Sequence, residues 1–283
     1  MTLDIELLRS WVGRTETIED IATLAPLRAL TATLDRDDPP GNPGDPVPPC
    51  WHWLYFLPMA RQSEIGPDGH PKRGGFLPPI PLPRRMWAGS QLQFHTSLRA
   101  GQALSRTSRI ADVQLKQGRT GPLVFVNVDH EVRADGELAI TERHDIVYRD
   151  FPQPNEAPPA PVPAPERTQW SRPIEADGVL LFRYSALTFN GHRIHYDRRY
   201  VTEVEGYPGL VVHGPLIATL LLDLLRRELP DAEVKTFAFR AVKPLFDVAP
   251  FTVCGFQEDA ATVKLWARTA DGHLAMEATA TLY

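Results

Sequence analysis

The segment Tyr184-Ser-Ala-Leu-Thr-Phe-Asn-Gly-His-Arg-Ile-His-Tyr-Asp197 places a polar cluster after an apolar stretch of the chain. Nineteen residues after His195, Gly214 follows a histidine in the segment Val211-Val-His-Gly-Pro-Leu216. Histidine can transfer a proton near neutral pH, and the free N–H groups at a helix start stabilise negative charge. The two segments together predict one small active site, and therefore an enzyme.

Outward from these segments, the residues predict the same order of elements in each half of the chain. Next to these segments we expect a strand at 179–187. Apolar residues that recur with the period of a helix predict a helix from about Pro215 to Leu229. In the N-terminal half, 17–34 is expected to be a helix that starts near Thr17. Alternating apolar residues predict strands at 89–97, 102–115, 121–133, 137–149, 234–245, 250–257, 261–269 and 273–282. Each half thus predicts one long helix wrapped by an antiparallel sheet.

Proline divides the chain. The run from Pro152 to Pro165 has the composition of a semi-rigid extended linker. It separates an N-terminal domain, 1–151, from a C-terminal domain, 166–283. We expect the two halves to pack as one pseudo-dimer with a continuous sheet.

The composition bounds the class of protein. Of 283 residues, 43% are hydrophobic and 23% are charged, which is typical of globular proteins, and the net charge of −5 does not favour nucleic-acid binding. No apolar run reaches the ~20 residues of a membrane span, and the acidic N-terminus does not resemble a signal peptide. The two cysteines, Cys50 and Cys254, lack metal-ligand spacing. A cytoplasmic protein without a metal or a redox cofactor is expected.

The C-terminal half resembles the MaoC-like, or hydratase-2-like, hotdog domains that hydrate or dehydrate acyl thioesters. Those domains carry a Gly-Asp-x-Asn-Pro-x-His pattern, on whose histidine His195 falls, and then a His-Gly pair that His213-Gly-Pro-Leu216 matches. The segments Gly206–Leu216 and Leu82–Ser90 extend the resemblance over the whole chain. They are similar to two-hotdog bacterial proteins described as mesaconyl-C4-CoA (3-methylfumaryl-CoA) hydratases and to related hydroxyacyl-thioester dehydratases.

The resemblance implies an α+β fold, a tandem (double) hotdog whose N-terminal half is non-catalytic and whose C-terminal half is catalytic. It implies a hydro-lyase that reversibly hydrates an α,β-unsaturated acyl-CoA, with mesaconyl-C4-CoA to citramalyl-CoA as the best expectation. Coenzyme A is then part of the substrate, and no separate cofactor is needed. Further association of the two-half unit into a homo-oligomer is left open.

The chain departs from the family pattern at the catalytic aspartate, where it has Asn190. His195 is expected to move the proton, alone or with Asn190 positioning the water, and Asp197 could orient its imidazole. The N–H of Gly214 is expected to hold the enolate oxygen. His213 is expected to hydrogen-bond the helix start rather than to transfer protons.

Further residues are expected to bind substrate. His192 and Arg193, which replace the pattern's asparagine and proline, could bind a second carboxylate on the acyl group. The candidates for the phosphates of coenzyme A are Arg84, Arg85, Arg240 and Lys243. Two other functions stay open: an acyl-CoA thioesterase, and a non-catalytic subunit that binds acyl thioesters.

Overall fold

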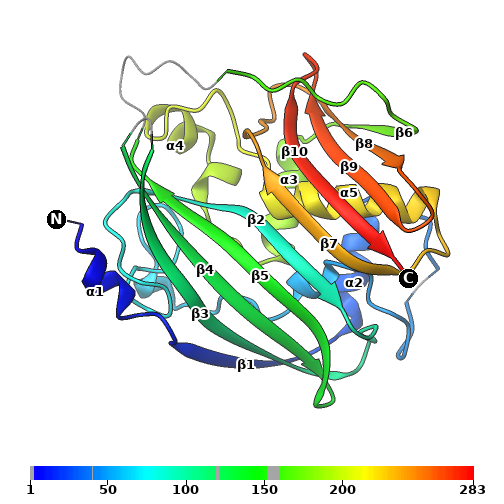
Figure 1. Ribbon diagram of the computed structural model, residues 1–283, viewed down its shortest axis with the longest axis horizontal. Coiled ribbons are helices and arrows are strands. Elements are labelled where there is room, and N and C mark those ends of the chain that lie inside the picture. The colour runs from blue at the N-terminus through cyan, green and yellow to red at the C-terminus, as the bar shows by residue number, and fades with distance from the viewer. Residues whose placement is uncertain (1–2, 40, 119–120, 152–159) are drawn as a thin grey trace.

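The computed structural model describes residues 3–39, 41–118, 121–151 and 160–283. Ten strands form one antiparallel sheet that runs through both halves of the chain, in the order β1-β3-β4-β5-β2-β7-β10-β9-β8-β6 (Figure 1). The strands are β1 Thr15–Ile21, β2 Arg84–Phe94, β3 Ala103–Gly118, β4 Gly121–Ala134, β5 Glu137–Arg149, β6 Trp170–Ile174, β7 Val234–Ala241, β8 Phe251–Gln257, β9 Thr262–Thr269 and β10 Leu274–Leu282.

The two halves have the same strand order. Counted outward from the β2–β7 junction, each half contributes its second, fifth, fourth, third and first strand. At the junction Gly89 pairs with Arg240, and a Cβ atom at Gly89 would lie 2.6 Å from the carbonyl oxygen of Phe239. This symmetric arrangement confirms the tandem fold and the continuous sheet that the sequence predicts.

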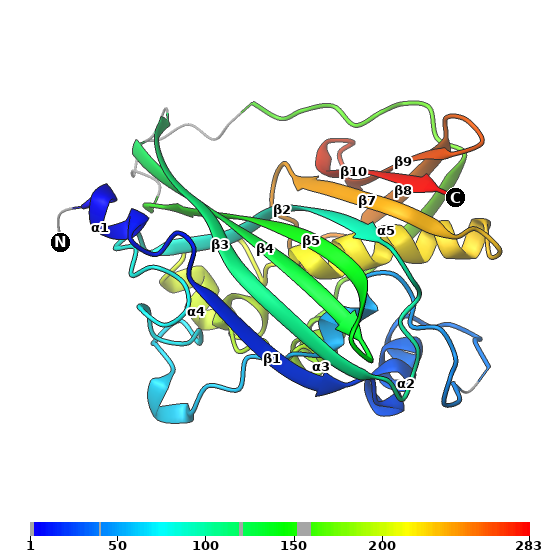
Figure 2. The ribbon, with the colours of Figure 1, turned by 60° about the horizontal axis from the view of Figure 1, so that its bottom comes forward.

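The helices differ between the halves. They are α1 Ile5–Arg9, α2 Leu24–Thr33, α3 Gly178–Leu187, α4 Arg198–Glu203 and α5 Gly214–Glu228, with short 3-10 turns η1 Trp51–Leu54, η2 Gln62–Glu64 and η3 Arg193–His195. Helix α5 lies along the inner face of the C-terminal strands and contacts four of them (Figure 2). Its residues 216–225 are all buried, so the predicted apolar helix is confirmed.

Two expected elements are wrong. Residues 179–187 form helix α3 rather than a strand, because the Asp177 side chain accepts the N–H of Leu180 and caps a helix start. The buried residues of this run are Leu181, Tyr184 and Ser185, and their spacing is that of one face of a helix. Residues 17–34 are also not one helix, because 15–21 form the edge strand β1 and the helix α2 follows Thr23.

The N-terminal half also lacks the long helix that we expected for it. Helix α2 has ten residues and packs against α3 and η1, whereas α5 has fifteen. The eight strands expected from alternation are present, with their ends shifted by a few residues; β1 and β6 were not expected. Of the predicted linker, 152–159 lie outside the described residues, and Val162 and Ala164 pair with the β9–β10 turn.

A buried ion-pair network joins the halves. The Asp223 carboxylate on α5 is 3% exposed and binds Arg36 at 2.6 Å, Arg172 at 2.9 Å and Arg227 at 2.8 Å. Arg36 follows α2, and Arg172 lies in β6. The network therefore fixes α5, which positions the candidate site, against both the N-terminal half and the edge of the C-terminal sheet.

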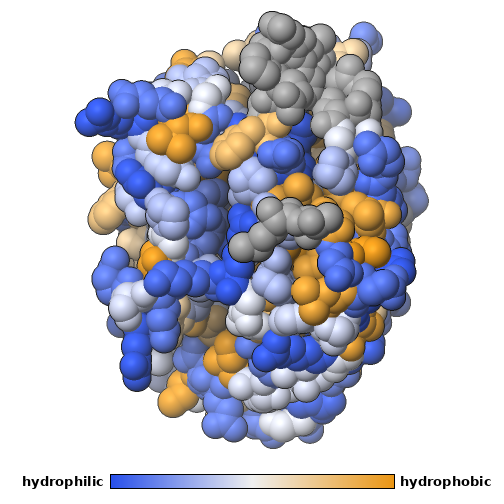
Figure 3. All heavy atoms as spheres, turned by 90° about the vertical axis from the view of Figure 1, so that its left-hand side faces the viewer, coloured by the Kyte–Doolittle hydropathy of each residue, from blue (hydrophilic) through white to orange (hydrophobic). Residues whose placement is uncertain are grey.

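The end of the molecule near α1 and α4 is covered mostly by hydrophilic residues, with hydrophobic residues gathered on one side (Figure 3). Among the described residues, no helix is both long and apolar enough to span a membrane.

Candidate active site

His195 lies at the end of η3 and is 7% exposed. Its Nδ1 atom lies 2.7 Å from the carbonyl oxygen of Val211, and because a carbonyl only accepts, Nδ1 carries the hydrogen and Nε2 keeps its lone pair. Burial lowers the pKa of His195 to about 4, against the opposing effect of that carbonyl. His195 is therefore a neutral imidazole at pH 7, with a fixed tautomer that can accept a proton at Nε2.

The start of α5 lies beside this imidazole. The ring of His213, the N-cap of α5, stacks on His195 with 3.7 Å between centroids. The expectation that the His213 side chain hydrogen-bonds the helix start is wrong: its Nε2 lies 2.8 Å from the Ser185 hydroxyl, so α3 holds this ring. Burial lowers the pKa of His213 as well. Gly214 opens the helix, and its backbone N–H belongs to the first turn, whose N–H groups have no partner within the helix.

The approach to Gly214 is open on the side where a side chain would lie. A Cβ atom built there has one neighbour within 4 Å, the carbonyl oxygen of Trp87 at 3.8 Å. A reacting group could therefore come close to this N–H. The structure thus brings together the two segments, around His195 and Gly214, that the sequence linked.

Asp197 does not orient the imidazole of His195, and that expectation is wrong. Its carboxylate caps α4 by accepting the N–H of Tyr200 and pairs with Arg193 at 2.7 Å. The Val211 carbonyl orients the ring instead. The difference arises because Asp197 is the N-cap of α4 and stays half-buried in that role, held by the Tyr200 N–H and by Arg193, while His195 is buried against Val211.

Asn190 and Arg193 make local contacts. The Asn190 Oδ1 atom accepts the backbone N–H of His192 at 3.0 Å and so closes a turn. The Arg193 guanidinium pairs with Asp197 and lies 4.2 Å from the ring centroid of Tyr200. The Arg193 guanidinium also donates to the carbonyl of Pro67 in the N-terminal half, so its charge is paired with Asp197 and its donors are engaged before any substrate binds.

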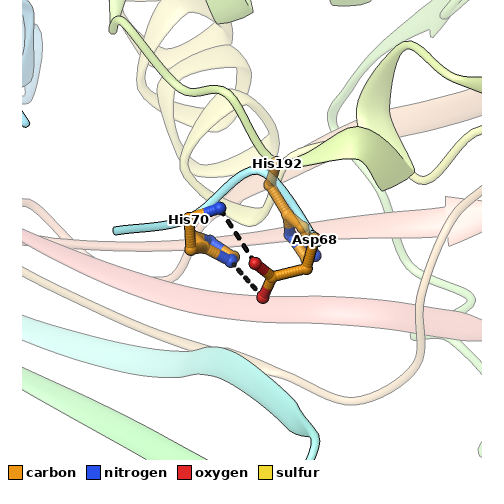
Figure 4. A group of neighbouring side chains, drawn as sticks. All are labelled: Asp68, His70 and His192. Carbon is orange, nitrogen blue, oxygen red and sulfur yellow. Dashed lines mark hydrogen bonds and ion pairs between the residues drawn. The ribbon is translucent and has the colours of Figure 1, made fainter. Parts of the chain in front are cut away.

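A loop of the N-terminal half adds two residues that the sequence did not single out. Asp68 and His70 lie beside His192, whose ring centroid is 4.0 Å from His70 and 5.5 Å from His195 (Figure 4). His70 Nδ1 lies 3.2 Å from Asp68 Oδ2, and the His70 N–H donates to Oδ1 at 3.1 Å. Burial opposes ionisation of Asp68, but these hydrogen bonds lower its pKa.

The local sequence gave no sign of this contribution. The pair Asp271-x-His273 has the same spacing and the same Nδ1–Oδ2 hydrogen bond, at 2.8 Å, yet it is on the surface. What distinguishes Asp68 and His70 is their position in space, next to a turn more than a hundred residues away in the chain. Oxygen or nitrogen donors of Asp68, His70 and His192 lie within 4.8 Å of one another, so these three side chains could also hold a metal ion.

The four basic residues predicted to bind the phosphates of coenzyme A do not lie together. Burial lowers the pKa of His70 and of His192, and the positive charge of Arg85 lowers both further, so Arg85 lies within electrostatic range of the two rings, while its guanidinium hydrogen-bonds the side chain of Tyr148. Arg84 pairs with Glu205 at 3.3 Å and lies over the Tyr207 ring. The other two basic residues make contacts along the C-terminal sheet: Arg240 forms an exposed ion pair with Glu277, and the backbone N–H of Lys243 donates to Ala275.

The N-terminal sheet holds a second buried histidine cluster. Glu142 is 5% exposed and binds His52 Nε2 at 3.0 Å, His144 Nε2 at 2.7 Å and the Ser90 hydroxyl at 3.0 Å. The ring of His144 contacts His130, at 4.3 Å between centroids. The sequence did not predict this cluster, because its members are spread over η1, β2, β4 and β5.

Comparison with known proteins gives a family match and a relative of similar length. The family model for hydroxyacyl-thioester dehydratase type 2 matches residues 50–247. The chain is 47% identical to the mesaconyl-C(4)-CoA hydratase of Chloroflexus aurantiacus, over 96% of this chain and 97% of that protein.

Two solved structures from Mycobacterium tuberculosis share the fold. HtdX superimposes with a TM-score of 0.67 at 19% identity, covering 95% of this chain and all of that one. A second protein, described as having a double hotdog fold, superimposes with a TM-score of 0.60 at 13% identity and covers 96% of both chains. The fold is therefore a double hotdog, and the chain belongs to the hydroxyacyl-thioester dehydratase type 2 family.

Proposed function

We propose that this protein reversibly adds water to an α,β-unsaturated acyl-CoA, with mesaconyl-C4-CoA as substrate and citramalyl-CoA as product. The observation that carries the proposal is the buried, neutral His195, whose Nε2 is free to accept a proton beside the start of α5. The C. aurantiacus relative, similar over almost the full chain, bears the name of this activity.

The geometry supports a simple division of roles. The His195 Nε2 atom removes a proton from water, and the water oxygen bonds to the β-carbon of the thioester. The electron pair of the double bond moves toward the thioester oxygen, where the N–H of Gly214 and the dipole of α5 stabilise the enolate. The imidazolium of His195 then returns the proton to the α-carbon. Water is thus added without any net change in the protein.

The second carboxylate of a dicarboxylic acyl group needs a cation. Arg193, which the sequence suggested for this role, is already paired with Asp197. Arg85 takes the role in our proposal, because its charge acts on His70 and His192 within the site. Its guanidinium can hold a carboxylate through two parallel hydrogen bonds.

The test is a spectroscopic assay of the purified protein with mesaconyl-C4-CoA, crotonyl-CoA and a longer enoyl-CoA. We expect loss of the enoyl-thioester absorbance with mesaconyl-C4-CoA as the preferred substrate. In the Arg85→Ala variant we expect KM to rise for mesaconyl-C4-CoA but not for crotonyl-CoA, whereas Arg109→Ala, at an exposed ion pair of the N-terminal sheet, serves as the matched control. Release of free coenzyme A without hydration would instead identify a thioesterase and disprove the proposal.

A further inference from the structure

The loop 66–70 of the N-terminal half is docked on the turn that leads to His195. The backbone N–H of Arg193 donates to the carbonyl of Asp68 at 2.9 Å, and the Arg193 guanidinium donates to the carbonyl of Pro67 at 3.0 Å. Both halves therefore contribute backbone to one rigid junction at the site.

Gly69 makes this docking possible. Its φ angle is +90°, and a Cβ atom there would lie 1.8 Å from the carbonyl oxygen of Gly191. Glycine alone permits so close an approach of two backbones. The approach places the side chains of Asp68 and His70, on either side of Gly69, against the ring of His192.

The Asp68 carboxylate fixes the tautomer of His70. A carboxylate accepts, so the hydrogen between Asp68 Oδ2 and His70 Nδ1 belongs to the imidazole, and the lone pair of His70 is on Nε2. His195 has the same tautomer, set by the Val211 carbonyl. His70 and His195, each with a lone pair on Nε2, thus both lie against the ring of His192; Figure 4 shows the contact with His70.

We infer that His70, oriented by Asp68, is a further catalytic residue that holds the attacking water; the inference rests on the proposed hydratase function. A water whose oxygen must attack carbon is oriented when both of its hydrogens are accepted. His195 accepts the hydrogen that is transferred, and His70 accepts the other one. Asn190 is poorly placed for this task, because its side-chain oxygen already accepts the N–H of His192.

The atoms balance in this arrangement. One O–H bond of the water breaks, and its proton goes to His195 and then to the α-carbon. The second hydrogen stays on the oxygen and becomes the hydrogen of the new hydroxyl group, while His70 accepts its hydrogen bond throughout. Asp68 acts through His70 and is a positioning residue.

The experiment compares His70→Ala and Asp68→Asn with the matched surface variants His273→Ala and Asp271→Asn. We expect kcat for mesaconyl-C4-CoA to fall about 10²-fold in His70→Ala and about tenfold in Asp68→Asn, with KM little changed. The surface variants should keep the wild-type kcat. Added imidazole should restore part of the activity of His70→Ala, an effect that a purely structural role would not produce. If His70→Ala does not fold, His70→Gln is held to the same criterion for kcat.

Three results would overturn the inference. Wild-type kcat in both His70→Ala and Asp68→Asn would show that the pair takes no part in the reaction. Activity that is lost on dialysis against EDTA and restored by Zn²⁺ would show that Asp68, His70 and His192 bind a metal instead. A wild-type protein that hydrates no enoyl-CoA would disprove the proposed function itself, and the inference with it, which distinguishes this failure from the other two.

Discussion

The two halves of the sheet have the same strand order but enclose different contents. The C-terminal strands wrap α5, whose start lies against His195 and His213. The N-terminal strands face the short turn η1 and the cluster around Glu142. In the N-terminal cluster a carboxylate is surrounded by histidine, tryptophan and serine side chains, and we propose that this cluster is structural. In the C-terminal cluster, by contrast, His195 is held by a single carbonyl and keeps a free ring nitrogen.

Buried histidines therefore do not mark an active site by themselves. Among the described residues, ring nitrogens without a hydrogen-bond partner also occur in the N-terminal cluster, at His52 Nδ1 and His130 Nε2, so the difference between the halves is the helix start next to the ring of His195. The predictions below test this difference.

The largest effect is expected from removing the histidine of each half in turn. His195→Ala should lower kcat/KM by about 10²- to 10⁴-fold, because it removes the proton acceptor. His130→Ala, also buried but located in the N-terminal sheet, should leave kcat/KM within a small factor of wild type. The enoyl-absorbance assay measures both. Equal losses in the two variants would mean that the halves do not differ in the way proposed.

The next prediction concerns stability, and here the large effect is expected in the N-terminal half. Glu142→Ala should lower the free energy of unfolding by about 3 kcal/mol or more, because it leaves the buried His52 and the half-buried His144 without their shared acceptor. Urea unfolding measures the loss. The control is Asp271→Asn at the surface, where a change of about 0.5 kcal/mol or less is expected. A Glu142→Ala protein as stable as wild type would contradict a structural role for the cluster.

The sequence predicted those parts of the fold in which apolar residues recur at a regular interval. Helix α5 and eight of the strands follow from their apolar repeats, and the match of His195 with Gly214 identified the C-terminal site. The run at 179–187 was assigned wrongly because a short apolar run fits a strand and a buried helix equally well, and the cap at Asp177 decides for the helix.

The parts of the site that the sequence missed depend on contacts between distant segments. Asp68 and His70 reach His192 only because Gly69 docks on Gly191. Asp197 appeared well spaced to serve His195, but its carboxylate caps α4 and pairs with Arg193. Spacing along the chain does not give the direction of a side chain in an irregular turn.

A smaller effect should separate the starts of α5 and α3, two of the three helices that the structure describes in the C-terminal half. Gly214→Ala should lower kcat by about tenfold or more, because a methyl group would occupy the space through which the thioester approaches the N–H. Gly178, the first residue of α3, is the matched control, since a Cβ atom there also meets only ordinary contacts, the nearest at 3.9 Å. Steady-state kinetics and thermal unfolding of both variants test this. Unchanged kcat in Gly214→Ala would show that the thioester does not approach the helix start through this space.

The smallest effect concerns pH. Lowering the pH should reduce the free energy of unfolding through buried histidines in both halves, whereas the activity depends on His195 of the C-terminal half. Burial lowers the pKa of His195 to about 4 and also lowers the pKa of His130. An unfolded histidine binds a proton below about pH 6.5, whereas these folded ones do not, so stability falls as the pH falls from about 6.5 toward the folded pKa.

Each such histidine should cost about 1 kcal/mol of stability between pH 7 and 5.5. His130→Gln should therefore show a shallower loss in urea unfolding over this range. Over the same range kcat/KM of the wild type should stay level, because His195 remains neutral and able to accept a proton. An acid limb of kcat/KM centred near pH 6.5 would show that His195 is not held neutral by burial, and the distinction between the two clusters would then rest on the helix start alone.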